Sequence, residues 1–330
     1  MHDPLVSVHG LAVHFPLGRG LLGGGPVVRA VENVSLEIPR GAFFGLVGES
    51  GSGKTTLGRA ILKAAPVTAG DIKVYDRTEV FDVPRLDRAA TRRYRRRAQL
   101  VFQDPYAALS PRMTVRDIIA EPLEVMQLTT SRAETDARVR EIAAKCRLNL
   151  EHLRRFPHAF SGGQRQRISI ARALVAEPAF LVADESVAAL DVSIQADILN
   201  LLKDLRRDFG LTFLFISHDL SVVAHTCDHV AVMYLGRLVE TAPTRRLFVA
   251  PRHPYTRALL SAIPSLDPDD RGRAEKLAGE IPSPTKPPPG CKFHTRCRFA
   301  RDRCRVEEPE LRHLGGGSVV ACHYAEEIAG

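Results

Sequence analysis

Apolar and polar residues alternate in part at the start of the chain. Residues 5–15 (LVSVHGLAVHF) and 27–38 (VVRAVENVSLEI) are rich in Val and Leu, and a glycine-rich stretch joins them. Partial alternation in Val-rich segments is typical of strands that bury one face. The N-terminal region is therefore predicted to contain two strands.

The pattern then changes to a buried strand, a glycine loop and a helix, in the order AFFGLVG, ESGSGKTT, LGRAILKAA. Apolar strand-like segments return at 179–184 (AFLVAD), 213–217 (FLFIS) and 229–236 (HVAVMYLG), and helix-like segments separate them. Such alternation predicts an α/β domain with a largely parallel sheet.

Between these two regions, residues 110–158 follow a helical period. In DARVREIAAKCRL, one helix face carries Val139, Ile142, Ala143 and Cys146. A continuous apolar face of this kind packs against a core. Cys146 is therefore predicted to be a core residue. Cys227, next to the strand at 229–236, is also expected to be packed.

The composition changes after residue 250. IPSPTKPPPG (281–290) has five prolines in ten residues, which excludes a helix or central strand and predicts an extended connector. GCKFHTRCRFARDRC (290–304) begins a small cysteine-bearing module. The shift predicts a main domain over 1–250 and an extension over 251–330.

Composition narrows the function only in part. The chain has 330 residues, 45% of them apolar, which is enough for a sizeable core. Without a signal-peptide pattern or a run of about 18 apolar residues, a cytoplasmic protein is expected, where thiols stay reduced. The net charge of +8 suits nucleic acid, a membrane surface or phosphate ligands equally. RRYRRR (92–97) favours a solvated helix face over a nucleic-acid patch, because one Tyr makes no stacking platform.

GESGSGKT (48–55) fits the phosphate-binding pattern G-x-x-x-x-G-K-[ST] in its expected strand-loop-helix context. Its glycines let backbone N–H groups surround phosphate oxygens, Lys54 adds a positive charge, and the Thr55 hydroxyl can ligate Mg²⁺. The segment predicts nucleoside triphosphate binding. The predicted binding residues are Gly48, Glu49, Ser50, Gly51, Ser52, Gly53, Lys54, Thr55 and Thr56.

Two further motifs match such a site. In AFLVADE, Asp184 can hold the Mg²⁺ shell and Glu185 can act as general base, although an acidic pair is also a common strand end. In FSGGQRQR, Ser161, Gly162 and Gly163 stand before a helix, where N–H groups favour an anion. A plain N-cap with a glycine turn is the alternative.

The sequence SGGQ resembles the signature of ATP-binding cassette (ABC) proteins, and that family's other motifs follow in order. Gln103 in LVFQDP resembles the Q-loop, AALD (188–191) the D-loop, and His218 in FISHDL the switch histidine. The resemblance covers residues 5 to about 245. It implies a P-loop ABC nucleotide-binding domain with a mostly parallel core sheet, an antiparallel β subdomain and a helical subdomain near 104–170.

The resemblance also implies residue roles. Two such domains pair head to tail, and each ATP lies between the phosphate loop with Asp184 of one subunit and Ser161, Gly162, Gly163 and Gln164 of the other. Hydrolysis then needs Glu185 as base and His218 to position the γ-phosphate, and Gln103 senses Mg²⁺ as a metal ligand beside Thr55 and Asp184.

Phe15 resembles the aromatic that stacks on adenine, with a strand-end core residue as the alternative. Asp191 belongs to the D-loop. Family members usually have Pro and Ser where this chain has Ser186 and Ala188, which puts the D-loop contacts across the dimer in doubt.

Several segments together resemble the ATP-binding subunits of dipeptide and oligopeptide ABC importers, nearest to the second of the two paralogous subunits: VFQDPYAALSPRMTV, HAFSGGQRQRISIARAL, PRHPYTRALLSAIP and GEIPSPTKPPPGCKFHTRC. This resemblance implies an ATP-hydrolysing subunit that powers import from the cytoplasmic face of the membrane, as a peripheral protein. The implied partners are a second paralogous ATP-binding subunit, two transmembrane permease subunits and an extracytoplasmic solute-binding protein, with no nucleic acid.

Four cysteines in the extension could close a [4Fe-4S] cluster or a Zn²⁺ site: Cys291, Cys297, Cys304 and Cys322. Their spacings, with 5, 6 and 17 intervening residues, match neither common zinc pairs nor ferredoxin runs, so spacing leaves the metal open. The resemblance implies an iron-sulfur site, with zinc or unliganded thiols as alternatives. His294 or His323 could replace a ligand. Five basic residues would offset the thiolate charge: Lys292, Arg296, Arg298, Arg301 and Arg303.

Two other functions compete with import. A soluble ABC-type ATPase acting on nucleic acid would use residues 92–97 and the cysteine module, but the 107 positions from Lys54 to Ser161 leave no room for a long coiled coil. A regulatory nucleotide-binding partner with a metal sensor would not need the base Glu185.

Overall fold

The chain folds into two compact units in the computed structural model, which describes residues 3–18, 25–77, 79–102, 104, 108–188, 190–263 and 279–328. Unit 1 comprises Met1–Val6, Ile38–Ala42 and Lys73–Phe215, and unit 2 comprises Ser7–Glu37, Phe43–Ile72 and Ile216–Gly330. Four strands have residues in both units: β1 (Pro4–Pro16), β2 (Val27–Pro39), β4 (Ala69–Tyr75) and β8 (Thr212–Ile216). The two strands predicted near the N-terminus are confirmed.

Unit 1 combines buried parallel strands with helices. In its sheet the strand order is β8-β7-β6, and β6 and β7 are parallel, with Ala98 opposite Phe180. Every residue of β7 and β8 is buried, as expected for strands covered on both faces. Its elements are β5 (Val80–Asp82), α2 (Arg88–Arg97), β6 (Ala98–Val101), α4 (Val115–Val125), α5 (Arg132–Lys145), α6 (Gly162–Leu174), β7 (Phe180–Asp184), α7 (Val192–Phe209), β8 (Thr212–Ile216) and the 3₁₀ turns Val83–Arg85, Leu150–Arg154 and Pro157–Ala159.

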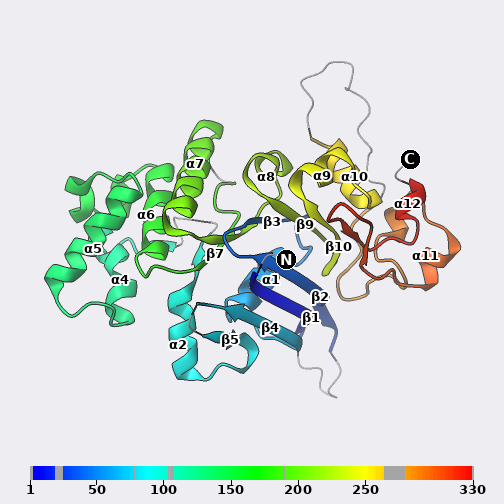
Figure 1. Cartoon of the computed structure of the whole chain (residues 1–330), viewed down its shortest axis with the longest axis horizontal. Coiled ribbons are helices and arrows are strands. Elements are labelled where there is room, and N and C mark those ends of the chain that lie inside the picture. The colour runs from blue at the N-terminus through cyan, green and yellow to red at the C-terminus, as the bar shows by residue number, and fades with distance from the viewer. Residues whose placement is uncertain are drawn as a thin grey trace. The chain divides into compact units, whose positions relative to one another are not determined.

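Helices α4, α5 and α6 pack against one another in unit 1 (Figure 1). The α5 side chains that face this packing include Val139, Ile142 and Ala143, and Cys146 directly after the helix is fully buried. Burial raises the pKa of the Cys146 thiol to about 12. The prediction of a helical region with Cys146 in its core is confirmed.

The basic run 92–97 lies on α2, whose N-cap Asp87 accepts a hydrogen bond from the Ala90 N–H at 2.7 Å. Tyr94 is fully buried, with its ring centroid 5.3 Å from that of Phe81, while the arginines lie at the surface. The predicted solvated helix face is confirmed. The one aromatic in the run serves the core and offers no stacking surface.

Unit 2 contains a mixed sheet with the strand order β11-β12-β10-β9-β3, in which β3 and β9 are parallel and β9 and β10 antiparallel. In its smaller sheet β1 lies between β2 and β4. The remaining elements of unit 2 are β3 (Phe43–Val47), α1 (Lys54–Ile61), α8 (Leu220–Thr226), β9 (His229–Tyr234), β10 (Arg237–Pro243), α9 (Thr244–Val249), α10 (Pro254–Ser261), the 3₁₀ turn His294–Arg296, α11 (Asp302–Val306), β11 (Arg312–His313), β12 (Val319–Val320) and α12 (Ala325–Ile328).

The cysteine-bearing extension is part of unit 2. Its strand β12 pairs with β10, placing Val319 opposite Thr241, so the extension continues the sheet. A small apolar cluster closes it, formed by Val320, Cys322, Ala325 and Ile328. The connector 281–290 contains neither helix nor strand, as predicted.

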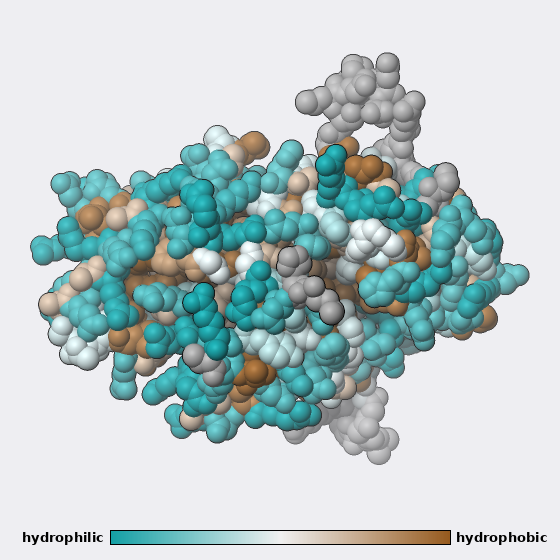
Figure 2. Space-filling model, viewed as in Figure 1, coloured by the Kyte–Doolittle hydropathy of each residue, from teal (hydrophilic) through white to brown (hydrophobic). Residues whose placement is uncertain are grey.

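The space-filling view shows a mostly hydrophilic face with apolar residues in small separate groups (Figure 2). In the part of the chain that the structure describes, no helix has the length and apolar character needed to cross a membrane. The predicted α/β architecture is confirmed.

Candidate functional site

Three glycines with positive φ shape the loop between β3 and α1: Gly48 (149°), Gly51 (77°) and Gly53 (103°). A Cβ on Gly48 would overlap the carbonyl oxygen of Met233, and one on Gly53 would overlap that of Ala30. Glycine is thus required both for the backbone conformation and for the close approach of neighbouring strands. The loop has the form that surrounds phosphate groups with backbone N–H donors.

Lys54 opens α1 and is only 5% exposed. Its ammonium group donates to the carbonyl oxygens of Gly48 at 2.7 Å and Glu49 at 2.9 Å. The positive charge is therefore held at the loop's own backbone, where an anionic ligand would meet it.

Residues far along the chain brace the same loop. The Glu49 N–H donates to the Tyr255 hydroxyl at 2.9 Å, and the Glu49 carboxylate accepts from both terminal nitrogens of Arg296, at 2.7 and 3.0 Å. The Gly236 N–H donates to the Ser52 carbonyl at 2.9 Å. These contacts could not be predicted from the sequence, because no local pattern connects residues 206 or 247 positions apart.

In unit 1, the end of β7 carries the two acidic residues predicted for catalysis. Asp184 is buried, and Glu185 follows it with a φ of 45°. That left-handed conformation is unfavourable for a residue with a Cβ and is often retained at functional sites. Ser186, which stands where the ABC family usually has Pro, is 2% exposed, and its hydroxyl has no hydrogen-bond partner among the described residues.

Ser161 caps α6 through a reciprocal pair of hydrogen bonds. Its hydroxyl accepts from the Gln164 N–H at 3.4 Å, and the Gln164 side chain accepts from the Ser161 N–H at 3.1 Å. The N-cap interpretation is confirmed. The hydroxyl proton still can be donated to an anion, so the cap and a phosphate contact are compatible. A Cβ on Gly163 would lie 2.5 Å from Ile194 Cγ2, which explains why a glycine stands where α6 approaches α7.

The other predicted site residues are distributed over both units. His218 is exposed just after β8 in unit 2, and Phe15 is half-buried at the end of β1. Asp191 is exposed at the N-terminus of α7 in unit 1. Gln103 lies outside the described residues. The phosphate loop, Phe15 and His218 thus belong to unit 2, and the signature, Asp184, Glu185 and Asp191 belong to unit 1.

The four cysteines of the extension share one neighbourhood. Cys304 and Cys322 are buried, and Cys291 and Cys297 are half-buried. Burial, together with the charges of the neighbouring thiolates, raises the pKa of Cys291 to about 12 and that of Cys297 to about 11. In the described residues, no three His, Cys, Asp or Glu side chains are arranged as a metal-binding group.

Most of the basic residues expected to offset thiolate charge also form ion pairs with carboxylates. Arg301 pairs with Glu327 at 2.7 Å, and Arg303 pairs with Glu307 at 2.6 Å. Arg298 does act on the thiols, since its charge lowers the pKa of Cys297 against the larger effect of burial.

The two histidines proposed as substitute ligands both meet backbone carbonyls. A ring nitrogen of His294 lies 2.9 Å from the Cys291 carbonyl, and one of His323 lies 3.0 Å from that of Glu307. These contacts hold each ring in a fixed orientation.

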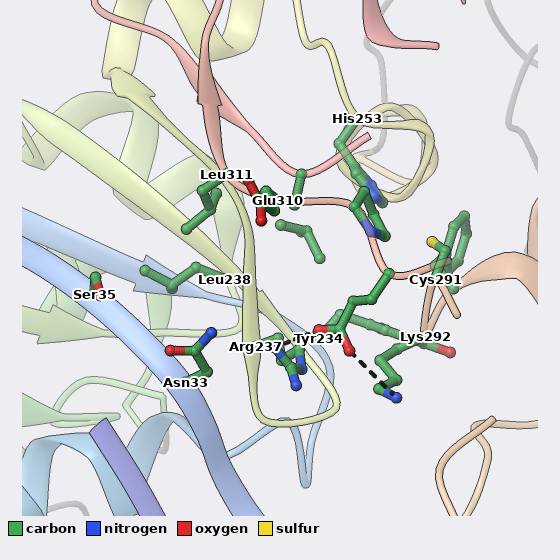
Figure 3. A pocket seen from close by; sticks show the side chains of 15 residues that line it. Asn33, Ser35, Tyr234, Arg237, Leu238, His253, Cys291, Lys292, Glu310 and Leu311 are labelled. Atoms are coloured by element: carbon green, nitrogen blue, oxygen red, sulfur yellow. Dashed lines mark ion pairs between the residues drawn. The ribbon is translucent and has the colours of Figure 1, made fainter. Parts of the chain in front are cut away.

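A cavity of about 550 Å³ lies beside this module in unit 2. Figure 3 shows Asn33 and Ser35 on one side of it and Cys291 and Lys292 on the other. Glu308 forms ion pairs across it with Arg237 and, at 3.7 Å, with Lys292. Cys291 is the member of the cysteine group that lines this cavity.

The glycine loop and its buried lysine, between a buried strand and a helix, define a P-loop nucleotide-binding protein. The family model for the ABC transporter matches residues 31–188, and the model for the oligopeptide/dipeptide transporter C-terminal region matches residues 239–304. With the relatives described next, these matches show that the chain belongs to the ABC transporter family, and it is an ATPase.

Curated relatives match almost the whole chain. A putative peptide import ATP-binding protein of Brucella ovis is 52% identical over 97% of both chains. The di/tripeptide transport ATP-binding protein DppF of Pseudomonas aeruginosa is 46% identical, over 99% of this chain and all of its own length. The dipeptide transport ATP-binding protein DppF of Escherichia coli is 44% identical, over 99% of this chain and 96% of its own length.

Solved structures agree with the cassette fold. The ATP-binding cassette MJ0796, solved as a dimer in a post-hydrolysis state bound to ADP and Pi, superposes with a TM-score of 0.63 at 28% identity. The superposition covers 73% of this chain and 99% of that one.

Proposed function

We propose that this chain is the ATP-hydrolysing subunit that powers import of dipeptides, oligopeptides or related small solutes across a membrane. The observation that carries the proposal is the phosphate loop with its buried Lys54, in a chain that also has the oligopeptide/dipeptide transporter C-terminal region. Peptide import ATP-binding proteins at 44 to 52% identity support the solute class.

In this proposal the loop residues 48–56 bind the triphosphate through backbone N–H groups and the Lys54 charge. A Mg²⁺ ion held by Thr55, Gln103 and Asp184 would neutralise charge on the phosphates. Glu185 accepts the proton of the attacking water, and the left-handed backbone at Glu185 supports a positioned carboxylate there. His218 holds the γ-phosphate, and Phe15 stacks on adenine.

The signature Ser161–Gln164 and the D-loop residue Asp191 are proposed to contact ATP bound to a partner subunit. The exposure of Ser161 and Gln164 supports a contact with another molecule. A dimeric cassette among the solved structures supports the pairing mode. The proposed partner is a paralogous ATP-binding subunit.

We further propose a peripheral position on the cytoplasmic face, with two permease subunits in the membrane and an extracytoplasmic solute-binding protein. In the proposed domain organisation, residues 1–250 form the ATP-binding domain, with a helical subdomain near 104–170, and residues 251–330 form a family-specific extension. The match of the C-terminal region model supports the extension.

The four cysteines are proposed to hold a [4Fe-4S] cluster, with Zn²⁺ as the alternative. The donor chemistry and the mutual effect of the thiols on their pKa values support a shared site. The protonated thiols would have to lose their protons and draw together around the cluster. Iron and acid-labile sulfide in equal amounts in anaerobically purified protein, lost in Cys297→Ser but kept in Cys227→Ala, would support the cluster. Zinc alone would support the alternative.

The decisive test of the function is Glu185→Gln in the assembled transporter. Loss of the general base should lower ATP hydrolysis by roughly 10²- to 10⁴-fold and stop solute uptake, while ATP binding persists. Glu177→Gln is a matched control, because Glu177 is exposed and also has a left-handed backbone, with a φ of 54°. Continued transport by Glu185→Gln would refute the assigned role and favour a regulatory, non-hydrolysing subunit.

Neither the family models nor the relatives favour action on nucleic acid. The burial of Tyr94 removes the one aromatic from the basic run 92–97, and Arg93 in that run pairs with Glu79 at 2.8 Å. The structure therefore adds no support for that alternative.

A further inference from the structure

One residue of the phosphate loop is joined to the cysteine module by a two-pronged ion pair. Both terminal nitrogens of Arg296 donate to the Glu49 carboxylate, at 2.7 and 3.0 Å. The Arg296 side chain is 5% exposed and that of Glu49 24%. Such bidentate pairs are the strong form of the charge-assisted hydrogen bond, and shielding from solvent keeps the interaction strong.

The position of Arg296 depends on the cysteines beside it. Arg296 ends a 3₁₀ turn in which its N–H donates to the Phe293 carbonyl at 3.0 Å and the Cys297 N–H donates to His294 at 3.4 Å. Cys291, at the start of the same stretch, donates its N–H to the Cys304 carbonyl at 2.9 Å. A change in how the thiols are held would therefore move the guanidinium group.

Aromatic packing also connects the phosphate loop with the cysteine module. The Phe293 ring lies 5.3 Å from both Tyr234 and Tyr255, and the Tyr255 hydroxyl accepts the Glu49 N–H at 2.9 Å. The Arg296 guanidinium lies 5.8 Å from the Tyr234 ring. The backbone and the carboxylate of Glu49 are thus both fixed by groups around the cysteine module.

We propose that Arg296 is a positioning residue for nucleotide binding, and that through it the state of the cysteine module sets the affinity of the phosphate loop. By holding Glu49, Arg296 keeps the loop in its phosphate-accepting form before nucleotide arrives, so that binding does not have to order it. This inference rests on the proposed role of residues 48–56 as the triphosphate site.

The test measures binding of Mg-ATP to the purified full chain by titration calorimetry. Arg296→Ala should weaken binding about 10-fold, the equivalent of one charge-assisted hydrogen bond, and Arg296→Lys should recover part of the loss. Arg303→Ala is the matched control. It breaks a similar bidentate pair in the same module, with Glu307 at 2.7 and 2.6 Å, that does not involve the phosphate loop.

A double substitution separates positioning from general loosening of the fold. Glu49→Gln should weaken binding as Arg296→Ala does, and combining the two should add little. Cys297→Ser should weaken binding in the otherwise unchanged chain but not in the Arg296→Ala background.

Three outcomes would overturn the inference: unchanged binding in Arg296→Ala, an equal loss in Arg303→Ala, or a Cys297→Ser effect that persists without Arg296. If the unsubstituted chain does not bind Mg-ATP, the proposed function fails instead, so the two failures are distinguishable.

Discussion

Replacing His253 by Asn should make the protein more resistant to acid. His253 caps α10 with its ring Nδ1, which accepts a hydrogen bond from the Tyr255 N–H at 3.0 Å. The backbone N–H of His253 donates to the Glu240 carboxylate at 2.8 Å. The ring is 1% exposed, and burial lowers the pKa of His253 to about 3. The folded protein therefore keeps this ring neutral at pH values where the unfolded chain protonates it.

The direction and size of this effect on the free energy of unfolding follow from proton linkage. With a pKa of about 3 when folded and about 6.5 when unfolded, the ring lowers the free energy of unfolding as the pH falls below 6.5. Between pH 7.5 and pH 5.0 this loss is about 2 kcal/mol, and it depends little on the folded value, because at pH 5.0 the folded ring is still neutral. Burial raises the pKa of Glu240, which acts in the opposite direction, but that residue is present in both proteins and cancels in the comparison.

The assay is urea unfolding followed by circular dichroism at pH 7.5 and 5.0. Asn keeps an acceptor at the N-cap but cannot titrate, so His253→Asn should lose about 2 kcal/mol less than the unsubstituted chain between the two pH values. His313→Asn, which replaces an exposed histidine on β11, is the control. Equal acid sensitivity of His253→Asn and the unsubstituted chain would refute the neutral buried ring.

Two further predictions concern the nucleotide site. Gly53→Ala should abolish ATP binding, because φ is 103° there and the new Cβ would overlap the Ala30 carbonyl. Gly51→Ala should lower the free energy of ATP binding far less, by about 1 kcal/mol, because φ is 77° there and the space around it is open. Equal losses of affinity in a binding titration would count against the steric argument. Ser186→Ala should raise the free energy of unfolding by about 1 kcal/mol, because it removes a buried hydroxyl without a partner among the described residues, and a fall in the melting temperature would show that the hydroxyl is bonded.

Local patterns in the sequence were sufficient for much of the fold. The strand β7, the helix face ending at Cys146 and the glycine loop each follow from residues that are neighbours in the chain. The partners of Arg296 and Arg303 could not be predicted in the same way. From their charge, both arginines were predicted to lie near the thiolates. In the structure each also lies at hydrogen-bond distance from a carboxylate, and the partner of Arg296 is 247 positions away in the chain.

Backbone strain was equally hidden from the sequence. The pair Asp184 and Glu185 is an ordinary strand end until the φ of 45° at Glu185 is known. The burial of the Ser186 hydroxyl is likewise a property of packing, because a serine after a strand is normally at the surface.

The bracing of the phosphate loop by Arg296 also has a consequence for the order of events during protein synthesis. Glu49 emerges from the ribosome 247 residues before Arg296 does. At a synthesis rate of roughly 5 to 20 residues per second, about 10 to 50 s pass between the synthesis of Glu49 and that of Arg296. A chain halted before residue 296 would display the phosphate-binding motif without that support, so nucleotide binding at full affinity would have to follow the synthesis of residue 296.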